Sequence, residues 1–180
     1  MVKKIAVALL LILVVLAVVV ALQPADFRIA RSRTVAAPPE VVHAFVNDFR
    51  NWPAWSPWEK LDPAMKRDVS TPSAGTGATY YWQGNDQVGE GRMTITESRP
   101  AQNITMRLEF LKPFAATNTA QFDFAPSGTG TNVTWSMKGT NNFIMKAFGL
   151  VMNMDKMVGA DFEKGLANLD AATAAARPAP

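Results

Sequence analysis

The chain has 180 residues, a formal net charge of +3 and 48% hydrophobic residues, which is enough for one ordinary domain and a short additional segment. It contains no cysteine and a single histidine, His43, which excludes disulfides, thiolate sites and metal sites built from several histidines. Basic residues never form a run longer than a pair, so we expect no nucleic acid as a partner. No nucleotide-binding or metal-binding motif occurs, so we expect no cofactor and no metal.

The N-terminal segment is the most apolar part of the chain. Residues 5–22 form an unbroken run of Ile, Leu, Val and Ala. As a helix this run would be about 27 Å long, close to the hydrocarbon thickness of a bilayer. A cleaved signal peptide is the competing interpretation, but its apolar region usually has about 7–15 residues, and the residues before Asp26 form a poor cleavage site. We therefore predict a single-pass transmembrane anchor over residues 1–24.

The charges around this segment indicate its orientation. Lys3 and Lys4 precede the apolar run and favour a cytoplasmic N-terminus. Arg28, Arg31 and Arg33 follow it closely and partly cancel that bias. Because we expect these arginines to lie in a folded strand, we predict that the domain is outside the cytoplasm.

Residues 25–173 are expected to form one domain, followed by a disordered low-complexity tail over 174–180. Prolines at positions 38 and 39 open a short helix that carries His43 beside its apolar face, so this histidine is expected to be exposed to solvent. Alternating apolar and polar residues, separated by turn sequences, predict a series of antiparallel strands. The expected strands span residues 27–36, 65–71, 78–83, 88–98, 103–111, 117–125 and 132–138.

The period changes from Asn142 onward, where apolar residues recur at steps of three and four. This spacing predicts one helix of about 30 residues, with Asn141 or Asn142 as its N-cap. A sheet with one apolar face needs a cover, and this helix is the only predicted element large enough to supply it. The predicted fold class is therefore α+β: an antiparallel sheet of six to seven strands gripping a long C-terminal helix, plus one N-terminal transmembrane helix.

The inward face of the sheet is rich in methionine and aromatic residues. Methionine suits an adaptable cavity that accepts an apolar ligand, and it equally suits a filled core, so the residues alone leave both interpretations open. The residues predicted to line a cavity are Met93, Ile95, Met106, Leu108, Phe110, Phe122, Phe124, Trp135 and Met137 on the sheet, with Met154 and Met157 on the helix.

Three tryptophans, Trp52, Trp55 and Trp58, recur at intervals of three residues and would cluster in a helical turn. They are candidates for the mouth of a cavity, and the alternative is that they plug one end of the sheet. Asp161 falls within the apolar stripe of the long helix, where a carboxylate needs a partner. It is a candidate polar anchor for a ligand or a general base, and the alternative is a structural bond, for example to a strand arginine.

The order of elements and three motifs carry a resemblance to a known superfamily. The motifs are the segments NDFRNWPAWSPW at 47–58, GTGTNVTW at 128–135 and the helical residues 154–166. Together they resemble the START-related helix-grip (SRPBCC) superfamily, and within it the polyketide cyclase/dehydrase and lipid-transport group. The resemblance implies an apolar ligand held between sheet and helix, with only some members acting as enzymes. The N-terminal anchor is a departure from most members, which are soluble.

These observations lead to one main functional hypothesis and two alternatives. We expect a membrane-tethered binding protein for an apolar small molecule or lipid. An enzyme of the cyclase or dehydratase kind would need a converging acid–base pair, and the sequence offers one inward carboxylate, so we lean away from catalysis. A protein-interaction or chaperone-assisting domain would instead have a filled core.

Overall fold

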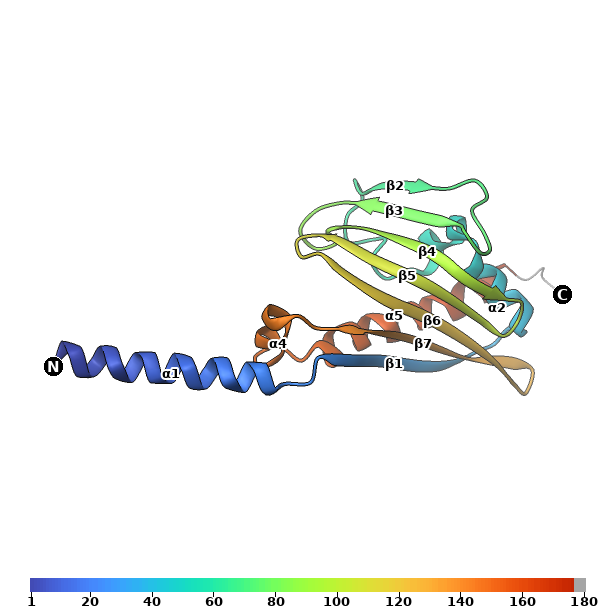
Figure 1. Cartoon of the computed structure of the whole chain (residues 1–180). Helices are drawn as coiled ribbons and strands as arrows, with labels where there is room; N and C mark the ends of the chain where they lie inside the picture. The colour runs from blue at the N-terminus through green and yellow to red at the C-terminus, as the bar shows by residue number, and fades with distance from the viewer. Residues whose placement is uncertain (177–180) are drawn as a thin grey trace.

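The computed structural model of this protein describes residues 1–176, and its centre is one curved sheet of seven antiparallel strands (Figure 1). The strands are ordered β1-β7-β6-β5-β4-β3-β2. Strands β2 to β7 are therefore adjacent in the sheet in the order in which they occur in the chain, and β1 lies at one edge beside β7. In chain order the elements are α1 (Val2–Leu22), β1 (Asp26–Val35), α2 (Pro39–Asn47), the 3-10 helix η1 (Phe49–Asn51), α3 (Trp52–Trp55), β2 (Lys66–Val69), β3 (Thr79–Gln83), β4 (Glu90–Arg99), β5 (Asn103–Lys112), β6 (Ala116–Ser127), β7 (Gly130–Thr140), α4 (Phe143–Gly149) and α5 (Met154–Ala175).

The predicted fold class is confirmed, because the sheet packs against a long C-terminal helix and one long apolar helix precedes the domain. The single 30-residue helix predicted from Asn142 is wrong in one respect, since the structure divides it into α4 and α5. Asn142 caps α4, as expected, by accepting a hydrogen bond from the Met145 backbone. Asn153 starts α5 in the same way through the Lys156 backbone. The first helix ends at Gly149, and Asn153, four residues later, begins the second.

Helix α5 is fixed to the sheet by charge and by close packing. Arg31 of β1 donates to Asp155 at 3.0 Å and to Glu163 at 2.8 Å, two carboxylates that flank Gly159 on one face of α5. A side chain at Gly159 would overlap the Arg31 guanidinium as it now lies, so glycine permits this close approach. Gly165 similarly leaves room for the ring of Trp135. The arginine thus pairs with these two acids of α5.

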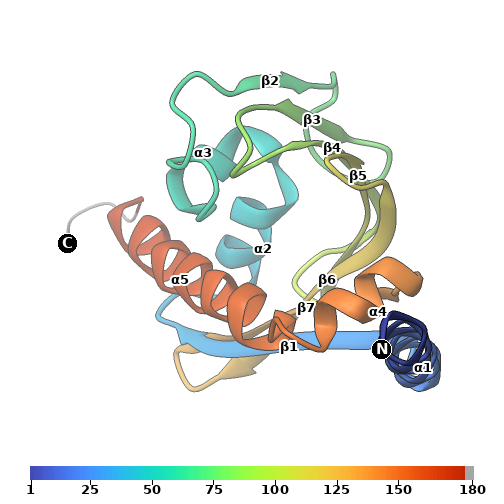
Figure 2. The same ribbon diagram turned by 90° about the vertical axis from the view of Figure 1, so that its left-hand side faces the viewer.

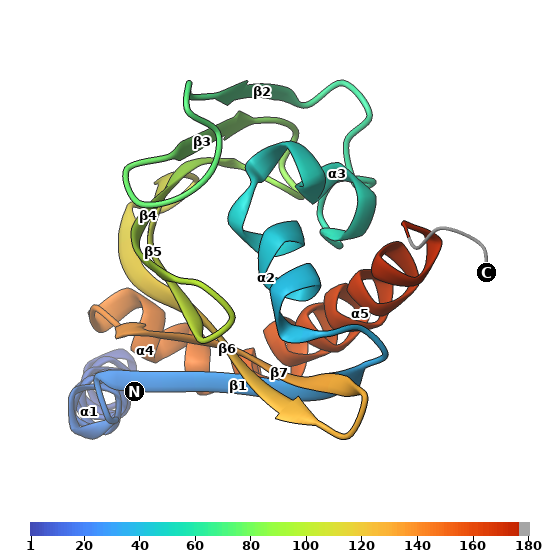
Figure 3. The same ribbon diagram turned by 90° about the vertical axis from the view of Figure 1, so that its right-hand side faces the viewer.

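Helices α2 and α3 lie inside the curve of the sheet at the end remote from α1 (Figure 3). They pack with α5 and the strands into a core whose buried residues all fall between Ile29 and Leu169. No residue of α1 belongs to this core. The predicted tail over 174–180 overlaps the end of α5, and residues 177–180 lie outside the described part of the chain.

His43 of α2 is buried, so the prediction that it faces solvent is wrong. It is 7% exposed, its Nε2 lies 3.2 Å from Ser98 Oγ, and its ring meets the ring of Phe124 edge-on. The short helix is covered on two sides, by the strands and by α5, so even a residue beside its apolar stripe is enclosed. Burial lowers the pKa of His43 below its usual value.

Helix α1 has a mean hydropathy of 3.6 over its most apolar window. It is long and apolar enough to cross a membrane, and a signal sequence has the same properties. In Figure 1 it projects away from the domain, and Val20 near its end is its one buried residue among those described.

The close packing at Gly165 gives a test of the contact between helix and sheet. A Cβ at this position would lie 2.6 Å from the Trp135 ring, whereas one at Gly149 would meet no atom within 4 Å. We expect Gly165→Ala to lower the free energy of unfolding by about 1–3 kcal/mol through overpacking. The matched Gly149→Ala change should be neutral or slightly stabilising. Urea unfolding of both variants measures their free energies of unfolding. Equal values for the two variants would contradict the close contact between Gly165 and Trp135.

The buried His43 predicts a dependence of stability on pH. Because its pKa is lower in the folded state, the unfolded chain takes up the proton more readily. The contribution to stability is therefore fully present above about pH 6.5 and is lost as the pH falls below that value. Urea unfolding at a series of pH values should show that the free energy of unfolding falls as the pH falls below about 6.5. In the His43→Gln variant the free energy of unfolding should depend less steeply on pH. An equally steep dependence in that variant would assign the effect to other groups.

Candidate functional site

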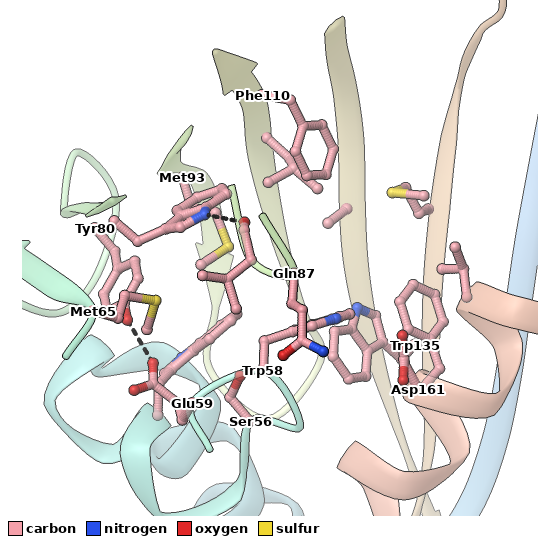
Figure 4. A pocket seen from close by; sticks show the side chains of 18 residues that line it. Ser56, Trp58, Glu59, Met65, Tyr80, Gln87, Met93, Phe110, Trp135 and Asp161 are labelled. Carbon is pink, nitrogen blue, oxygen red and sulfur yellow. Dashed lines mark hydrogen bonds between the residues drawn. The ribbon is translucent and has the colours of Figure 1, made fainter. Parts of the chain in front are cut away.

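A cavity of about 250 Å³ lies between the inner face of the sheet, the loop after α3 and the first half of α5 (Figure 4). Its walls are mainly apolar and aromatic. The lining residues are Trp52, Ser56, Trp58, Glu59, Met65, Tyr80, Trp82, Gln87, Val88, Met93, Leu108, Phe110, Ala120, Trp135, Met137, Val158, Asp161 and Phe162.

The cavity exists because the short helices α2 and α3 pack into only one end of the curved sheet. At the end remote from α1, α2 packs against β5 and β6, and the inward residues there are fully covered. At the other end the sheet is covered by α5 and by the loop after α3. Residues near the β3–β4 hairpin, such as Val88, and near the end of β5, such as Phe110, line the cavity there.

Aromatic rings form the rigid walls. Trp135 of β7 stacks on Phe162 of α5 with ring centroids 4.2 Å apart, and the ring of Trp58 meets Trp135 edge-on at 5.6 Å. On the opposite wall, Trp82 lies across Gly91, where a side chain would collide with its ring. Its indole Nε1 donates to the Val88 carbonyl at 3.0 Å. These contacts hold the walls apart without placing a side chain in the space between them.

One buried carboxylate, Glu59, lies at the cavity wall with two partners. The Tyr80 hydroxyl donates to its Oε1 at 2.5 Å, and Arg67 Nε donates to its Oε2 at 2.5 Å. Glu59 is 8% exposed, so it depends on these bonds to compensate for lost hydration. Burial and the bond to Glu59 raise the pKa of Tyr80, which therefore stays protonated and keeps donating.

A second carboxylate, Asp161, lines the cavity from α5. It is partly exposed, and among residues 1–176 it makes no hydrogen bond or ion pair with another side chain. Figure 4 places Asp161 beside Trp135, away from Glu59, with Trp58 and Gln87 between the two acids. The two carboxylates therefore do not converge on one point.

The sequence-predicted lining residues divide into three groups. Met93, Leu108, Phe110, Trp135 and Met137 line the cavity. Four others are at most 5% exposed in the packed core around α2 and α3 and do not line it, namely Ile95, Met106, Phe122 and Phe124. The two helix residues lie outside the lining, Met154 partly buried against the core and Met157 half exposed.

Two of the three tryptophans predicted for the cavity mouth lie deeper than expected. Trp52 and Trp55 are 2% and 1% exposed, and their rings contact each other and Phe122 in the core. Trp52 reaches the cavity wall, and Trp55 does not. Trp58 is partly exposed and lines the cavity. This placement matches the alternative in which these rings close one end of the sheet.

Sequence reasoning missed the polar cluster of Glu59, Tyr80 and Arg67. The Glu59 carboxylate is 21 residues from Tyr80 and follows an irregular segment, so no periodicity marks it as inward-facing. Tyr80 does alternate with Trp82 in β3, and this pattern places both rings on the inner face. The only other signal for the cluster was that Glu59 directly follows the segment rich in tryptophan and proline at 52–58.

Comparison with solved structures finds the same fold in several bacterial proteins. A protein from Rhodobacter sphaeroides is 17% identical, with a TM-score of 0.60 over 83% of this chain and 93% of its own. A protein from Chromobacterium violaceum is 16% identical, with a TM-score of 0.59 over 80% and 94%. A third, from Mycobacterium smegmatis, is 18% identical, with a TM-score of 0.58 over 83% and 92%. At these identities the likeness establishes the fold alone.

Sequence comparison adds the family. No curated protein matches the chain. The family described as polyketide cyclase / dehydrase and lipid transport matches residues 26–174, which is the whole domain after α1. The chain therefore belongs to the polyketide cyclase/dehydrase and lipid-transport family.

Proposed function

We propose that this protein is a membrane-tethered binding protein that holds an apolar small molecule or lipid between the sheet and α5. The observation that carries the proposal is the apolar cavity of about 250 Å³, walled by rigid aromatic rings. An apolar cavity of about 150 Å³ in a protein core suffices for a benzene ring, so this one has room for a larger group. Family membership supports an apolar ligand as well.

Asp161 is the proposed polar anchor. A partly exposed carboxylate in an otherwise apolar wall can accept a hydrogen bond from a ligand hydroxyl or amine. Glu59 is less suited to this role, because Tyr80 and Arg67 already occupy both of its oxygens. The ligand we infer is therefore an apolar body with one hydrogen-bond donor at the end that meets α5.

The geometry gives less support to a cyclase or dehydratase reaction. General acid–base chemistry needs two titratable groups within reach of one substrate. Glu59 and Asp161 lie on different sides of the cavity, and Glu59 is bonded to cationic and phenolic partners (Figure 4). A protein-interaction or chaperone-assisting domain is expected to have a filled core, so the cavity gives that alternative less support. Binding is therefore the function that accounts for most of the site.

We also propose that α1 is retained as an anchor and that the domain lies outside the cytoplasm. The apolar run is longer than a usual signal-peptide core, and Lys3 and Lys4 precede it. The full chain should keep its intact mass and stay with the membrane after an alkaline wash. A shorter chain that begins near Ala25 and appears in the soluble fraction would identify α1 as a signal sequence.

Filling the cavity tests the binding proposal. Leu108 lines the cavity from β5, and the neighbouring Arg107 points out to solvent from the same strand. The test uses the domain of residues 25–176, because its core contains no part of α1. We expect Leu108→Trp to weaken binding of the uncharged probe N-phenyl-1-naphthylamine by about tenfold or more. A tenfold weakening corresponds to a loss of about 1.4 kcal/mol of binding free energy.

The control is Arg107→Trp, which adds the same ring on the outer face and should leave the affinity unchanged. Fluorescence titration measures all three proteins, and their unfolding curves verify that each is folded. Equal affinities for the two variants, or no binding by the unaltered domain, would contradict a ligand in this cavity.

A further inference from the structure

Six exposed apolar side chains gather at the end of the domain from which α1 emerges. Helix α4 has no buried residue, although its sequence FIMKAFG is mostly apolar, and Val151 in the following turn is 82% exposed. Solvent exposure of this many large apolar groups at one site is unusual in a soluble surface. We call this group the apolar collar, and its members are Phe114, Phe143, Ile144, Phe148, Val151 and Met152.

The collar is physically continuous with α1. Helix α4 lies beside the last turns of α1, where Lys146 Nζ donates to the Ala21 carbonyl at 2.9 Å (Figure 2). The tip of the β5–β6 hairpin joins it, because the ring of Phe114 lies 6.2 Å from that of Phe148. The hairpin and α4 therefore form one surface around the point where α1 leaves the domain.

The connection between α1 and the sheet is too short to hold this surface away from a membrane. Helix α1 ends at Leu22 and β1 begins at Asp26, which leaves residues 23–25 as the linker. Three residues span at most about 10 Å, and the headgroup layer on each side of a bilayer is about 5–8 Å thick. If α1 crosses the bilayer, the first strand must start within or just above the headgroups.

The charge of the collar suits that position. The segment 141–153 contains no acidic residue, and Lys146 is its only charged one. The Lys146 ammonium group, which donates to the Ala21 carbonyl, lies where α1 leaves the domain, and its remaining N–H groups can donate to lipid phosphates while its stem stays in the apolar layer. A helix of seven residues is too short to span the bilayer, so an apolar helix with one lysine would lie at the interface.

The cavity lies toward the same end of the domain. In Figure 1 the β3–β4 and β5–β6 hairpins, α4 and the start of α5 all lie at the end that joins α1. Val88, Phe110 and Val158 line the cavity from the β3–β4 loop, the end of β5 and the first turns of α5. The collar and the cavity therefore occupy the same end, and α2 and α3 close the other.

We propose that the apolar collar is embedded in the headgroup layer of the bilayer that holds α1, so that the cavity faces the lipid and apolar ligands pass between them without crossing water. This inference rests on the proposed retention of α1 as an anchor. It adds a second membrane contact, which fixes the orientation of the domain on the bilayer.

Depth-dependent quenching tests the collar in the full chain. The protein has no cysteine, so a single introduced cysteine can carry an environment-sensitive NBD label. Val151→Cys labels the collar, and the matched control Ser127→Cys labels an exposed residue at the β6–β7 turn, at the far end of the domain. Both proteins are reconstituted into phosphatidylcholine vesicles with and without phosphatidylglycerol and with doxyl-labelled lipid.

We expect the label at Val151 to be blue-shifted and quenched several-fold more by doxyl lipid than by aqueous iodide, and the label at Ser127 to show the reverse. Flotation of the vesicles reports the anchor separately. A chain that floats with a Val151 label open to iodide would overturn the collar and leave the anchor intact. A label protected from both quenchers would also overturn it, because it would indicate a contact with a second copy. A chain that does not float would overturn the anchor, and the collar proposal with it.

Discussion

The concave apolar face of the seven-stranded sheet is the constraint on which the rest of the structure depends. A face this long must be covered, and the chain covers its two ends differently. Helices α2, η1 and α3 fill the end remote from α1 with large side chains such as Phe49 of η1 and Trp55 of α3. At the other end, α5 and the loop after α3 cover the sheet and leave an apolar cavity. The position of the cavity thus follows from where two short helices pack.

The polar groups of the site are arranged around this constraint. Arg31 of the edge strand β1 joins α5 to the edge of the sheet through ion pairs with Asp155 and Glu163. Glu59 is held by Tyr80 and Arg67 and contributes to the shape of the wall. Asp161 keeps an accepting carboxylate at the cavity. The proposed anchor and apolar collar would place this end of the domain at the source of an apolar ligand.

Much of the fold was predictable from the sequence because it depends on local periodicity. Alternation along β4 to β7 identified the strands and their inward residues, and the stripe after Asn142 identified the covering helix. The break between α4 and α5 was missed, because Leu150 and Val151 continue the apolar stripe into the turn before the Asn153 cap. Predicting which inward residues line a cavity was not feasible. Met93 and Met106 have the same pattern, and only the packing of α2 separates them.

The central claim is that the cavity holds an apolar molecule acquired from lipid. Native mass spectrometry tests it most directly, using residues 25–176 after incubation with vesicles of total lipid extract. The account predicts one apolar molecule bound per chain, released by organic solvent and absent from the Leu108→Trp variant. A folded protein that stays bare, or a variant that carries the same molecule as the unaltered domain, would contradict it.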